Sequence, residues 1–313
     1  KAAALVNWQL ELIPVEAAKY IVVAADEIFN GEFDDQFPID IFQTGSGTSS
    51  NMNANEIIAT RAGELGNIRI HPQDHVNFGQ SSNDVFPTAL RLACISEIYE
   101  KLIPAMHILH KSLLAQAEKN SQIVKLGRTH LMDATPVTFG QIFGGYARQV
   151  ALGIERIHNS LIHLSELPQG GTAVGTGINT HERFGEIFAK KVSELTTYNF
   201  VEAKDHFEAQ SCLDAPAELS AALKTFACSL MKIANDFRWM NSGPMGGISE
   251  IFLKAHQPGS SIMPGKVNPV MEESLCMVCA QVIGHDAAIT VAAQSGNFEL
   301  NTMFPLVAHN LLD

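Results

Sequence analysis

Residues 143–164 read FGGYARQVALGIERIHNSLIHL, and apolar side chains recur in this stretch at alternating intervals of three and four residues. Seven side chains form the stripe: Phe143, Ala147, Val150, Ile154, Ile157, Leu161 and Leu164. Such a seven-residue repeat gives a helix one continuous apolar face, which other helices must cover. The stretch therefore predicts a long helix inside a helical bundle.

Two other segments repeat this spacing, residues 92–113 and residues 219–240. Pro104 lies within the first and is expected to kink it, because proline lacks a backbone N–H and its ring crowds the preceding turn. Three such stripes predict long helices that run side by side. Residues 270–293 contain no Lys or Arg and few acidic side chains, which predicts a helix at the centre of the bundle.

The amino-terminal part of the chain has a different pattern. Residues 1–30 read as helical with a break at Pro14, and residues 31–43 read as an irregular acidic connection. The sequence thus predicts a mostly α fold. We expect a smaller N-terminal helical domain in residues 1–84, followed by the long-helix bundle in residues 85–313.

The composition narrows the classes of function. With 313 residues, 46% of them hydrophobic, the chain can bury a sizeable core. A net charge of −12 argues against nucleic acid or an anionic membrane surface as the main partner, and no uninterrupted apolar run is long enough to predict a membrane span. Five cysteines scattered through apolar segments predict reduced thiols in a reducing compartment. Cys276 and Cys279 form a lone CxxC with no second pair, and no Asp, Glu or Cys joins His107 and His110 at helical spacing, so no metal site is predicted.

Residues 258–269, PGSSIMPGKVNP, form the most distinctive polar break between the long helices. Glycine and proline exclude a regular helix or strand here, which leaves backbone N–H groups free to face a ligand. Lys266 and Asn268 add donors suited to a carboxylate, and Pro269 is expected at the first position of the next helix. A flexible linker fits poorly because apolar residues punctuate the loop. A phosphate-binding P-loop fails because Val267 stands where Ser or Thr is required.

Other polar segments lie at predicted helix starts. Residues 43–56, QTGSGTSSNMNANE, lack the third glycine and the preceding strand of a dinucleotide-binding turn. Residues 81–84, SSND, would on their own serve as a capping segment. Thr135 and Pro136 look like the cap and the first residue of a helix, which would put His130 beside a helix start. A lone histidine is more often structural than catalytic, so the pattern alone leaves its role open.

The loop GSSIMPGKVNP resembles the signature of the fumarase and aspartase superfamily of lyases, and the likeness extends over nearly all of the chain. Within this superfamily the chain resembles the class II fumarate hydratases. Those enzymes carry Thr-His where this chain has Thr129-His130, whereas aspartases carry glutamine at the histidine position. Members of the family continue further, so the resemblance implies truncation at both ends. Residues 245–247, Met-Gly-Gly, depart from the Arg-Cys-Gly of many fumarases and put any contact of that arginine in question.

The resemblance implies reversible hydration of fumarate to (S)-malate by anti addition of water. It assigns Ser260 as the base on carbon, and His130, paired with Glu273, as the group that handles water. Serine can act as a base only if backbone N–H donors and a cation such as Lys266 stabilise its alkoxide. The implied substrate-binding residues are Ser46, Gly47, Thr48, Ser81, Ser82, Asn83, Thr129, Ser261, Lys266 and Asn268.

The resemblance also implies a homotetramer with active sites shared between subunits, no cofactor and no metal, and a cytoplasmic or mitochondrial-matrix location. A secondary dicarboxylate site is implied at His71, Pro72, Gln73 and Asp74. Two alternatives stay open. An aspartate ammonia-lyase shares the signature but is opposed by His130 and by Gly170-Gly171-Thr172. An inactive lyase-fold protein with a binding or structural role is the other.

Overall fold

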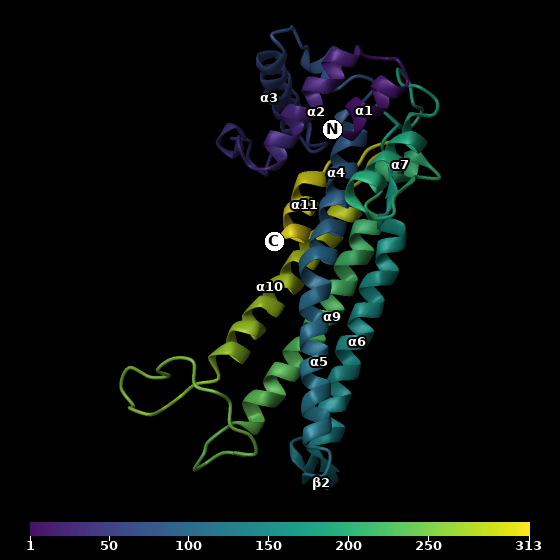
Figure 1. Cartoon of the computed structure of the whole chain (residues 1–313). Coiled ribbons are helices and arrows are strands. Elements are labelled where there is room, and N and C mark those ends of the chain that lie inside the picture. The colour runs from purple at the N-terminus through teal and green to yellow at the C-terminus, as the bar shows by residue number, and fades with distance from the viewer. The chain divides into compact units, whose positions relative to one another are not determined.

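The computed structural model describes the whole chain, residues 1–313, and the contacts within it group into two compact units. The first unit consists of residues 1–97, 161–217 and 288–313, and the second of residues 98–160 and 218–287. Both consist mainly of helices (Figure 1), so the predicted mostly α fold is confirmed. The division of the chain into domains after residue 84 stays a prediction.

The amino-terminal helices of the first unit are α1 (Ala2–Gln9), α2 (Val15–Phe29) and α3 (Thr48–Gly66). Pro14 is the residue immediately before α2, as the predicted break requires, because its fixed φ suits a helix start. Small and branched side chains form their shared core: Ala4, Ile13, Ala17, Ala18, Ile21, Ala24, Ala59 and Ala62. Alanine allows the helices to approach closely, so this short segment can bury a core of its own.

The rest of the first unit combines α4 (Ser82–Glu97), α7 (Phe184–Thr196), α8 (His206–Ser211) and α11 (Phe304–Leu312). Two short strands, β3 (Glu166–Leu167) and β4 (Val201–Glu202), pair in parallel. Strand β4 and helix α8 both lie in the segment that follows α7 in the chain. The Asp205 carboxylate caps α8 by accepting the Glu208 N–H at 3.0 Å, which is what allows so short a helix to form.

The second unit contains α5 (Ile103–Lys119) and most of three long helices, α6 (Phe139–Leu164), α9 (Asp214–Met240) and α10 (Val270–Ala293). Figure 1 shows α5, α6 and α9 side by side. All seven side chains of the α6 stripe are buried. A Cβ on Gly153 of α6 would lie 2.6 Å from the Phe226 ring and 3.3 Å from Met106, so glycine lets three helices meet. The predicted bundle is confirmed.

The expected kink near Pro104 takes the form of a π-helical turn, η3 (Ile98–Leu102), between α4 and α5. A π turn holds one more residue than an α turn, and it places the proline at the start of α5, where its missing N–H costs nothing. The extra residue rotates the apolar stripe of this segment around the helix axis. Ile98 is therefore 5% exposed, whereas Tyr99, which the sequence pattern assigned to the apolar face, is 38% exposed.

A β-hairpin precedes α6, and no strand was predicted there. Strand β1 (Val124–Thr129) pairs antiparallel with β2 (Met132–Thr138). The prediction that Thr135 and Pro136 start a helix is wrong, because Pro136 lies in β2 opposite Leu126. The helix start lies three residues later. The Thr138 hydroxyl accepts the Gln141 backbone N–H at 3.1 Å and the side-chain Oε1 of Gln141 accepts the Thr138 N–H at 2.9 Å, a reciprocal capping box.

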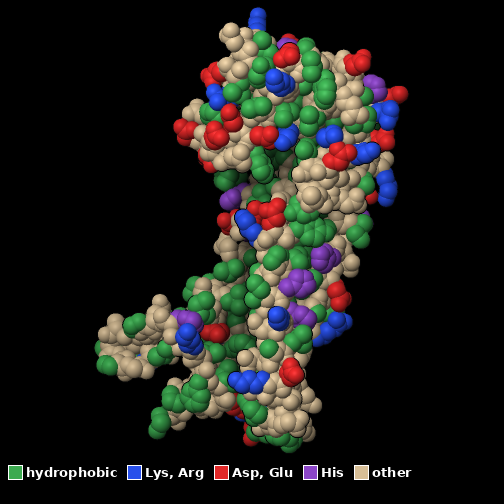
Figure 2. Space-filling model, in the orientation of Figure 1, with side chains coloured by type: hydrophobic (Ala, Val, Ile, Leu, Met, Phe, Trp, Pro, Cys, Tyr) green, Lys and Arg blue, Asp and Glu red, His purple; other side chains and the backbone are tan.

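Helix α10 exposes much of its apolar surface within this single chain. Met271, Met277, Val278 and Val291 are each more than half exposed, and Figure 2 shows hydrophobic side chains along the helix. By length and composition alone α10 could cross a membrane. Its one buried carboxylate, Asp286, instead accepts the Ser220 hydroxyl of α9 at 2.8 Å, a polar pairing that suits a bundle helix.

Candidate active site

The signature loop lies in the second unit, within residues 241–269, which contain no helix or strand. Its backbone folds over the Ser260 side chain. The Ser260 Oγ accepts the N–H of Met263 at 3.0 Å and the N–H of Ile262 at 3.3 Å. Two donors on one hydroxyl oxygen stabilise negative charge on it, which is the arrangement that a serine base requires.

Two polar side chains further along the loop, Lys266 and Asn268, hold its ends together. The Asn268 amide donates to the carbonyl of Gly259 at 2.5 Å, and the Lys266 ammonium donates to the Asn268 Oδ1 at 2.9 Å. Lys266 is exposed, and an ammonium has three N–H groups, so two are left for a ligand. Helix α10 begins just after Pro269, whose carbonyl accepts the Glu273 N–H at 3.1 Å.

His130 is held at the tip of the β1–β2 hairpin. Thr129 pairs with Met132, which leaves His130 and Leu131 as a two-residue loop with φ values of 56° and 61°. Loops of this kind normally use Asn and Gly, because other residues are strained at positive φ. Strained residues gather at functional sites, and the His130 side chain is exposed. The hairpin therefore presents this imidazole outward.

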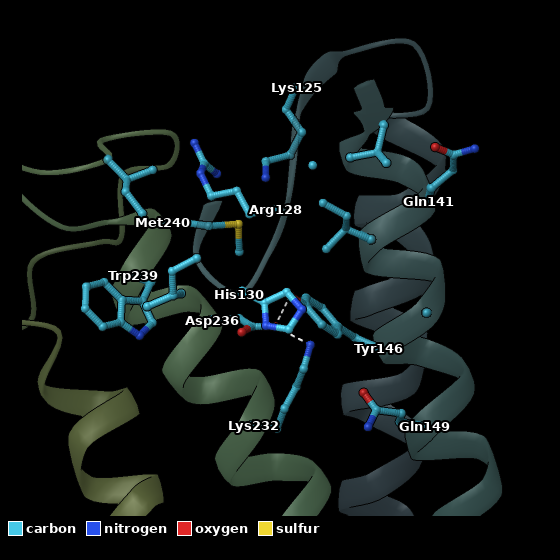
Figure 3. Close-up of a pocket in the computed structure, with 16 residues that line it drawn as sticks. Lys125, Arg128, His130, Gln141, Tyr146, Gln149, Lys232, Asp236, Trp239 and Met240 are labelled. Carbon is cyan, nitrogen blue, oxygen red and sulfur yellow. Dashed lines mark hydrogen bonds and ion pairs between the residues drawn. The ribbon is translucent and has the colours of Figure 1, made fainter. Parts of the chain in front are cut away.

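A cavity of about 600 Å³ lies beside His130 in the second unit (Figure 3). Tyr146 donates its hydroxyl proton to Asp236 Oδ2 at 2.6 Å, and Lys232 pairs with the same oxygen. The Lys232 ammonium also lies 4.8 Å from the centre of the Tyr146 ring. Burial and the contact with Asp236 raise the pKa of the Tyr146 hydroxyl, which keeps it protonated as a donor.

A second carboxylate, Glu250, joins the segment after α9 to strand β1. Its oxygens lie 3.0 Å from the Lys125 ammonium and 2.8 Å from the Arg128 guanidinium. Burial alone would raise the pKa of Glu250, but the hydrogen bonds from Arg128 and Lys125 outweigh it and lower the pKa. Because Arg128 lies two residues before His130, this ion pair fixes the hairpin that carries the histidine.

The Ser46-Gly47-Thr48 segment forms the start of α3 in the first unit. Gly47 has a φ of 74°, and a Cβ there would lie 2.0 Å from the Phe86 ring, so only glycine fits. The turn brings the hydroxyls of Ser46 and Thr48 to within 2.8 Å of each other beside the free N–H groups of the helix start. Hydroxyls at a helix N-terminus suit a carboxylate.

Residues 81–84 cap α4, as the plain interpretation of that segment predicted. The Ser81 hydroxyl accepts the Asn83 N–H at 3.2 Å, and Asp84 accepts the Ser81 N–H at 2.9 Å. The buried Ser82 hydroxyl accepts a hydrogen bond from Asn51 at 3.0 Å. The Asn83 amide donates to the Ala173 carbonyl at 2.7 Å. All three predicted substrate-binding side chains are therefore held in fixed positions.

The predicted secondary site forms a tight turn in the first unit, η2 (Pro72–Val76). The His71 Nδ1 accepts the N–H groups of Gln73 at 3.3 Å and Asp74 at 3.2 Å. Gln73 and Asp74 are exposed and line a cavity of about 540 Å³ together with Ser81. The turn thus offers polar groups to the same cavity as the α4 capping segment.

The structure brings some of the predicted residues together and leaves others apart. Ser46 and Thr48 lie in the first unit, whereas His130, Ser260 and Glu273 lie in the second. Within the second unit His130 makes no hydrogen bond to Glu273, which instead lies 4.0 Å from Arg238. The predicted pairing is therefore not made within this chain.

Sequence reasoning missed several polar side chains that support these segments. They are Lys125, Tyr146, Lys232, Asp236 and Glu250. The four-residue spacing of Lys232 and Asp236 on one helix was a usable signal. No pattern in the sequence pointed to Glu250, because its partners lie more than 100 residues away and only the folded chain brings them together.

Comparison with known proteins places the chain in a family. A family model described as Lyase matches residues 1–284. The class II fumarate hydratase of Xylella fastidiosa is 53% identical over 312 residues, which cover all of this chain and 66% of that protein. The mitochondrial fumarate hydratase of Schizosaccharomyces pombe is 54% identical, with 61% of its length covered. The class II fumarate hydratase of Nitrosomonas europaea is 51% identical, with 69% covered.

A crystal structure of class II fumarase from Schistosoma mansoni has a TM-score of 0.98 and 41% identity, covering 99% of this chain and 69% of that one. The chain thus spans about two thirds of the length of its relatives, 66% and 61% for the first two. The expected lyase fold and the resemblance stated from the signature loop are both confirmed. This chain belongs to the lyase family and, within it, to the class II fumarate hydratases.

Proposed function

We propose that the whole protein catalyses the reversible anti addition of water to fumarate, which yields (S)-malate. The observation that carries the proposal is the Ser260 hydroxyl, which accepts two backbone N–H groups within the signature loop. The names of relatives about half identical to this chain support the same reaction. Removing a proton from carbon beside a carboxylate requires a strong, stabilised base, and this loop is built to support one.

Ser260 acts as the base on carbon in this mechanism. In the direction from malate to fumarate, its alkoxide takes a proton from the carbon next to a carboxylate. The N–H groups of Ile262 and Met263 hold the negative charge before the transfer, and Lys266 supplies a positive charge six residues along the same loop. Preorganised donors of this kind need no rearrangement during the reaction.

His130 acts at the oxygen end of the same bond. It donates a proton to the leaving hydroxyl in one direction and polarises the attacking water in the other. The exposed position of His130 at the hairpin tip lets it reach a substrate, and Glu273 is proposed to orient its imidazole. Within this chain Glu273 lies near Arg238 and makes no hydrogen bond to His130, so we propose that the Glu273 of another copy orients the imidazole.

The substrate carboxylates are proposed to bind to polar groups at two helix starts, at the end of β1 and in the signature loop. These are Ser46 to Thr48 at α3, Ser81 to Asn83 at α4, and Thr129, Ser261, Lys266 and Asn268 in the second unit. Helix N-termini and fixed N–H donors favour anions. His71 to Asp74 are proposed as the secondary dicarboxylate site, because Gln73 and Asp74 share a cavity with Ser81.

The protein is proposed to assemble as a homotetramer whose copies share active sites. Exposed apolar side chains along α10 support this, because a stripe of this size on a water-exposed helix is unfavourable. His130 and Glu273 make no hydrogen bond to each other within one chain, which also supports an assembly with shared active sites. Bacterial and mitochondrial relatives make the cytoplasm or the mitochondrial matrix the proposed location.

The test is to add fumarate to the pure whole protein, without ammonia, and follow the loss of fumarate absorbance and the appearance of malate. We expect malate as the sole product. Turnover only in the presence of ammonia, with aspartate formed, would assign the aspartate ammonia-lyase activity instead. No turnover under either condition would leave a lyase-fold protein with a binding or structural role.

A further inference from the structure

One buried carboxylate has no role in the proposed mechanism, although it directly follows the substrate-binding segment. Asp84 is 0% exposed. Its Oδ1 accepts the Ser81 N–H at 2.9 Å, and its Oδ2 accepts the N–H groups of Gly170 at 3.1 Å and Thr172 at 2.9 Å. Three donors around one side chain suit an ionised carboxylate, which only accepts hydrogen bonds. Asp84 therefore joins α4 to a turn more than 80 residues further along the chain.

The turn that Asp84 holds is strained. Thr172 has a φ of 58°, which is a true outlier for a β-branched residue. The turn is fixed from two sides, since Asp84 accepts the Thr172 N–H and the buried Gln210 amide donates to the Thr172 carbonyl at 2.8 Å. Strain of this kind persists only where the surroundings over-determine it, and it gathers at functional sites.

The two joined segments form walls of one cavity. The cavity of about 540 Å³ in the first unit is lined by Gln80 and Ser81 on one side and by Thr172 and Ala173 on the other. Asn83 bridges the same walls by donating to the Ala173 carbonyl at 2.7 Å. The width of this cavity is therefore set by the hydrogen bonds of Asp84 and Asn83.

We propose that Asp84 is a positioning residue that fixes the turn of residues 170–173 against the Ser81–Asn83 segment and thereby sets the geometry of substrate binding. The inference rests on the proposed function, because it concerns the segment proposed to hold a substrate carboxylate. Asp84 does not touch substrate. It acts through Ser81 and Thr172, whose backbone N–H groups it holds.

The ionisation of Asp84 gives the proposal a signature that a purely structural residue lacks. Burial raises its pKa to about 6, although the backbone hydrogen bonds lower it. Other ionisable groups lie on the neighbouring elements: His206 lies 3.1 Å from Glu202, and Arg91 donates to the Glu166 carbonyl at 2.6 Å. Glu208 of α8 lies within 4.8 Å of Asp214, and Asp74, which lines the same cavity, lies 3.2 Å from His71. Protonation of Asp84 converts an acceptor into a donor and releases one N–H of the turn or of Ser81.

The test compares Asp84→Asn with the parent in the whole protein. We expect KM to rise about tenfold or more with kcat within about threefold, because a contact made equally in the ground and transition states affects KM alone. The amides of Gly170 and Thr172 should exchange hydrogen faster. The parent KM should rise as the pH falls through about 6, whereas the KM of the variant should not. Asp205→Asn is the control. It makes the same change at the cap of α8, where aspartate and asparagine serve equally well, so KM and kcat should stay at the parent values.

Each outcome decides the proposal. An Asp84→Asn enzyme with KM and kcat within twofold of the parent overturns the proposal. A rise of KM below a pH of about 6 that is as large in the variant as in the parent overturns it as well. If this variant does not fold, Gln210→Met loosens the same turn from the carbonyl side and should raise KM about threefold or more. A parent without fumarate turnover refutes the proposed function instead. In that case hydrogen exchange still tests the positioning role: unchanged amide exchange at Gly170 and Thr172 in Asp84→Asn would refute it.

Discussion

Ser260→Ala should lower kcat by about three orders of magnitude or more, which is the effect expected for a group that removes a proton from carbon. The change removes the one oxygen on which the N–H groups of Ile262 and Met263 converge. Binding of a dicarboxylate should persist, because Lys266 and Asn268 keep their mutual hydrogen bond. Steady-state kinetics of fumarate hydration, together with calorimetric binding of a saturated dicarboxylate, measure both effects.

The comparison variants for this prediction are Ser261→Ala and Ser112→Ala. Ser112 lies on α5 and donates to the Ile108 carbonyl at 2.8 Å, so its loss should leave the rate unchanged. A Ser260→Ala rate within tenfold of the parent would sink the assignment of the base. In that case a large loss in Ser261→Ala would move the role to the neighbouring serine.

His130→Asn should lower kcat by about two to four orders of magnitude, the usual effect of removing a general acid or base. Asparagine tolerates the positive φ of 56° at this position, so the hairpin should keep its shape. The loss should therefore arise from the missing imidazole. Rates across a pH series, with circular dichroism as the check on folding, test this directly.

The matched control is His107→Asn, which makes the same change at an exposed position of α5. Its rate should equal that of the parent. If His130→Asn retained the parent rate and pH profile, the histidine would be a structural turn residue, and another group would have to protonate the leaving hydroxyl.

Local periodicity was sufficient to predict the bundle. Every side chain of the α6 stripe is buried, because a seven-residue repeat depends only on neighbours along one helix. The same reasoning failed at Tyr99, where the π turn before Pro104 shifted the phase by one residue. A single-residue insertion of this kind leaves no trace in the spacing of apolar residues.

The β1–β2 hairpin escaped prediction for a different reason. Thr135 and Pro136 satisfy a local rule for helix starts, but pairing with β1 wins because Val124, Val137 and neighbouring residues favour an extended backbone. Strand pairing joins residues that are far apart in sequence, so the hairpin could not be predicted from a short window. It is nevertheless the element that presents His130.

The candidate site was predicted unevenly. Its loops could be found from sequence because glycine, proline and hydroxyl residues cluster there, and the resemblance supplied roles for Ser260 and His130. The long-range contacts of the supporting carboxylates could not, because Asp84 holds the N–H groups of Gly170 and Thr172, 86 and 88 residues away, and Glu250 pairs with Arg128, 122 residues away. Burial and charge pairing across such separations exist only in the folded chain.

We propose that Ser260 and His130 of one active site come from different copies of the chain, because Glu273, which follows Ser260 at the start of α10, makes no hydrogen bond to His130 within one chain. The most direct measurement mixes His130→Asn and Ser260→Ala chains of the whole protein, unfolds and reassembles them together, and follows fumarate hydration. Each variant alone should be inactive. Because each site draws its histidine and its serine independently, about a quarter of the sites in equal mixtures should be intact, and activity should return to about that fraction. Mixed tetramers that stay as inactive as either parent variant would show that one chain supplies both residues, and would contradict the account.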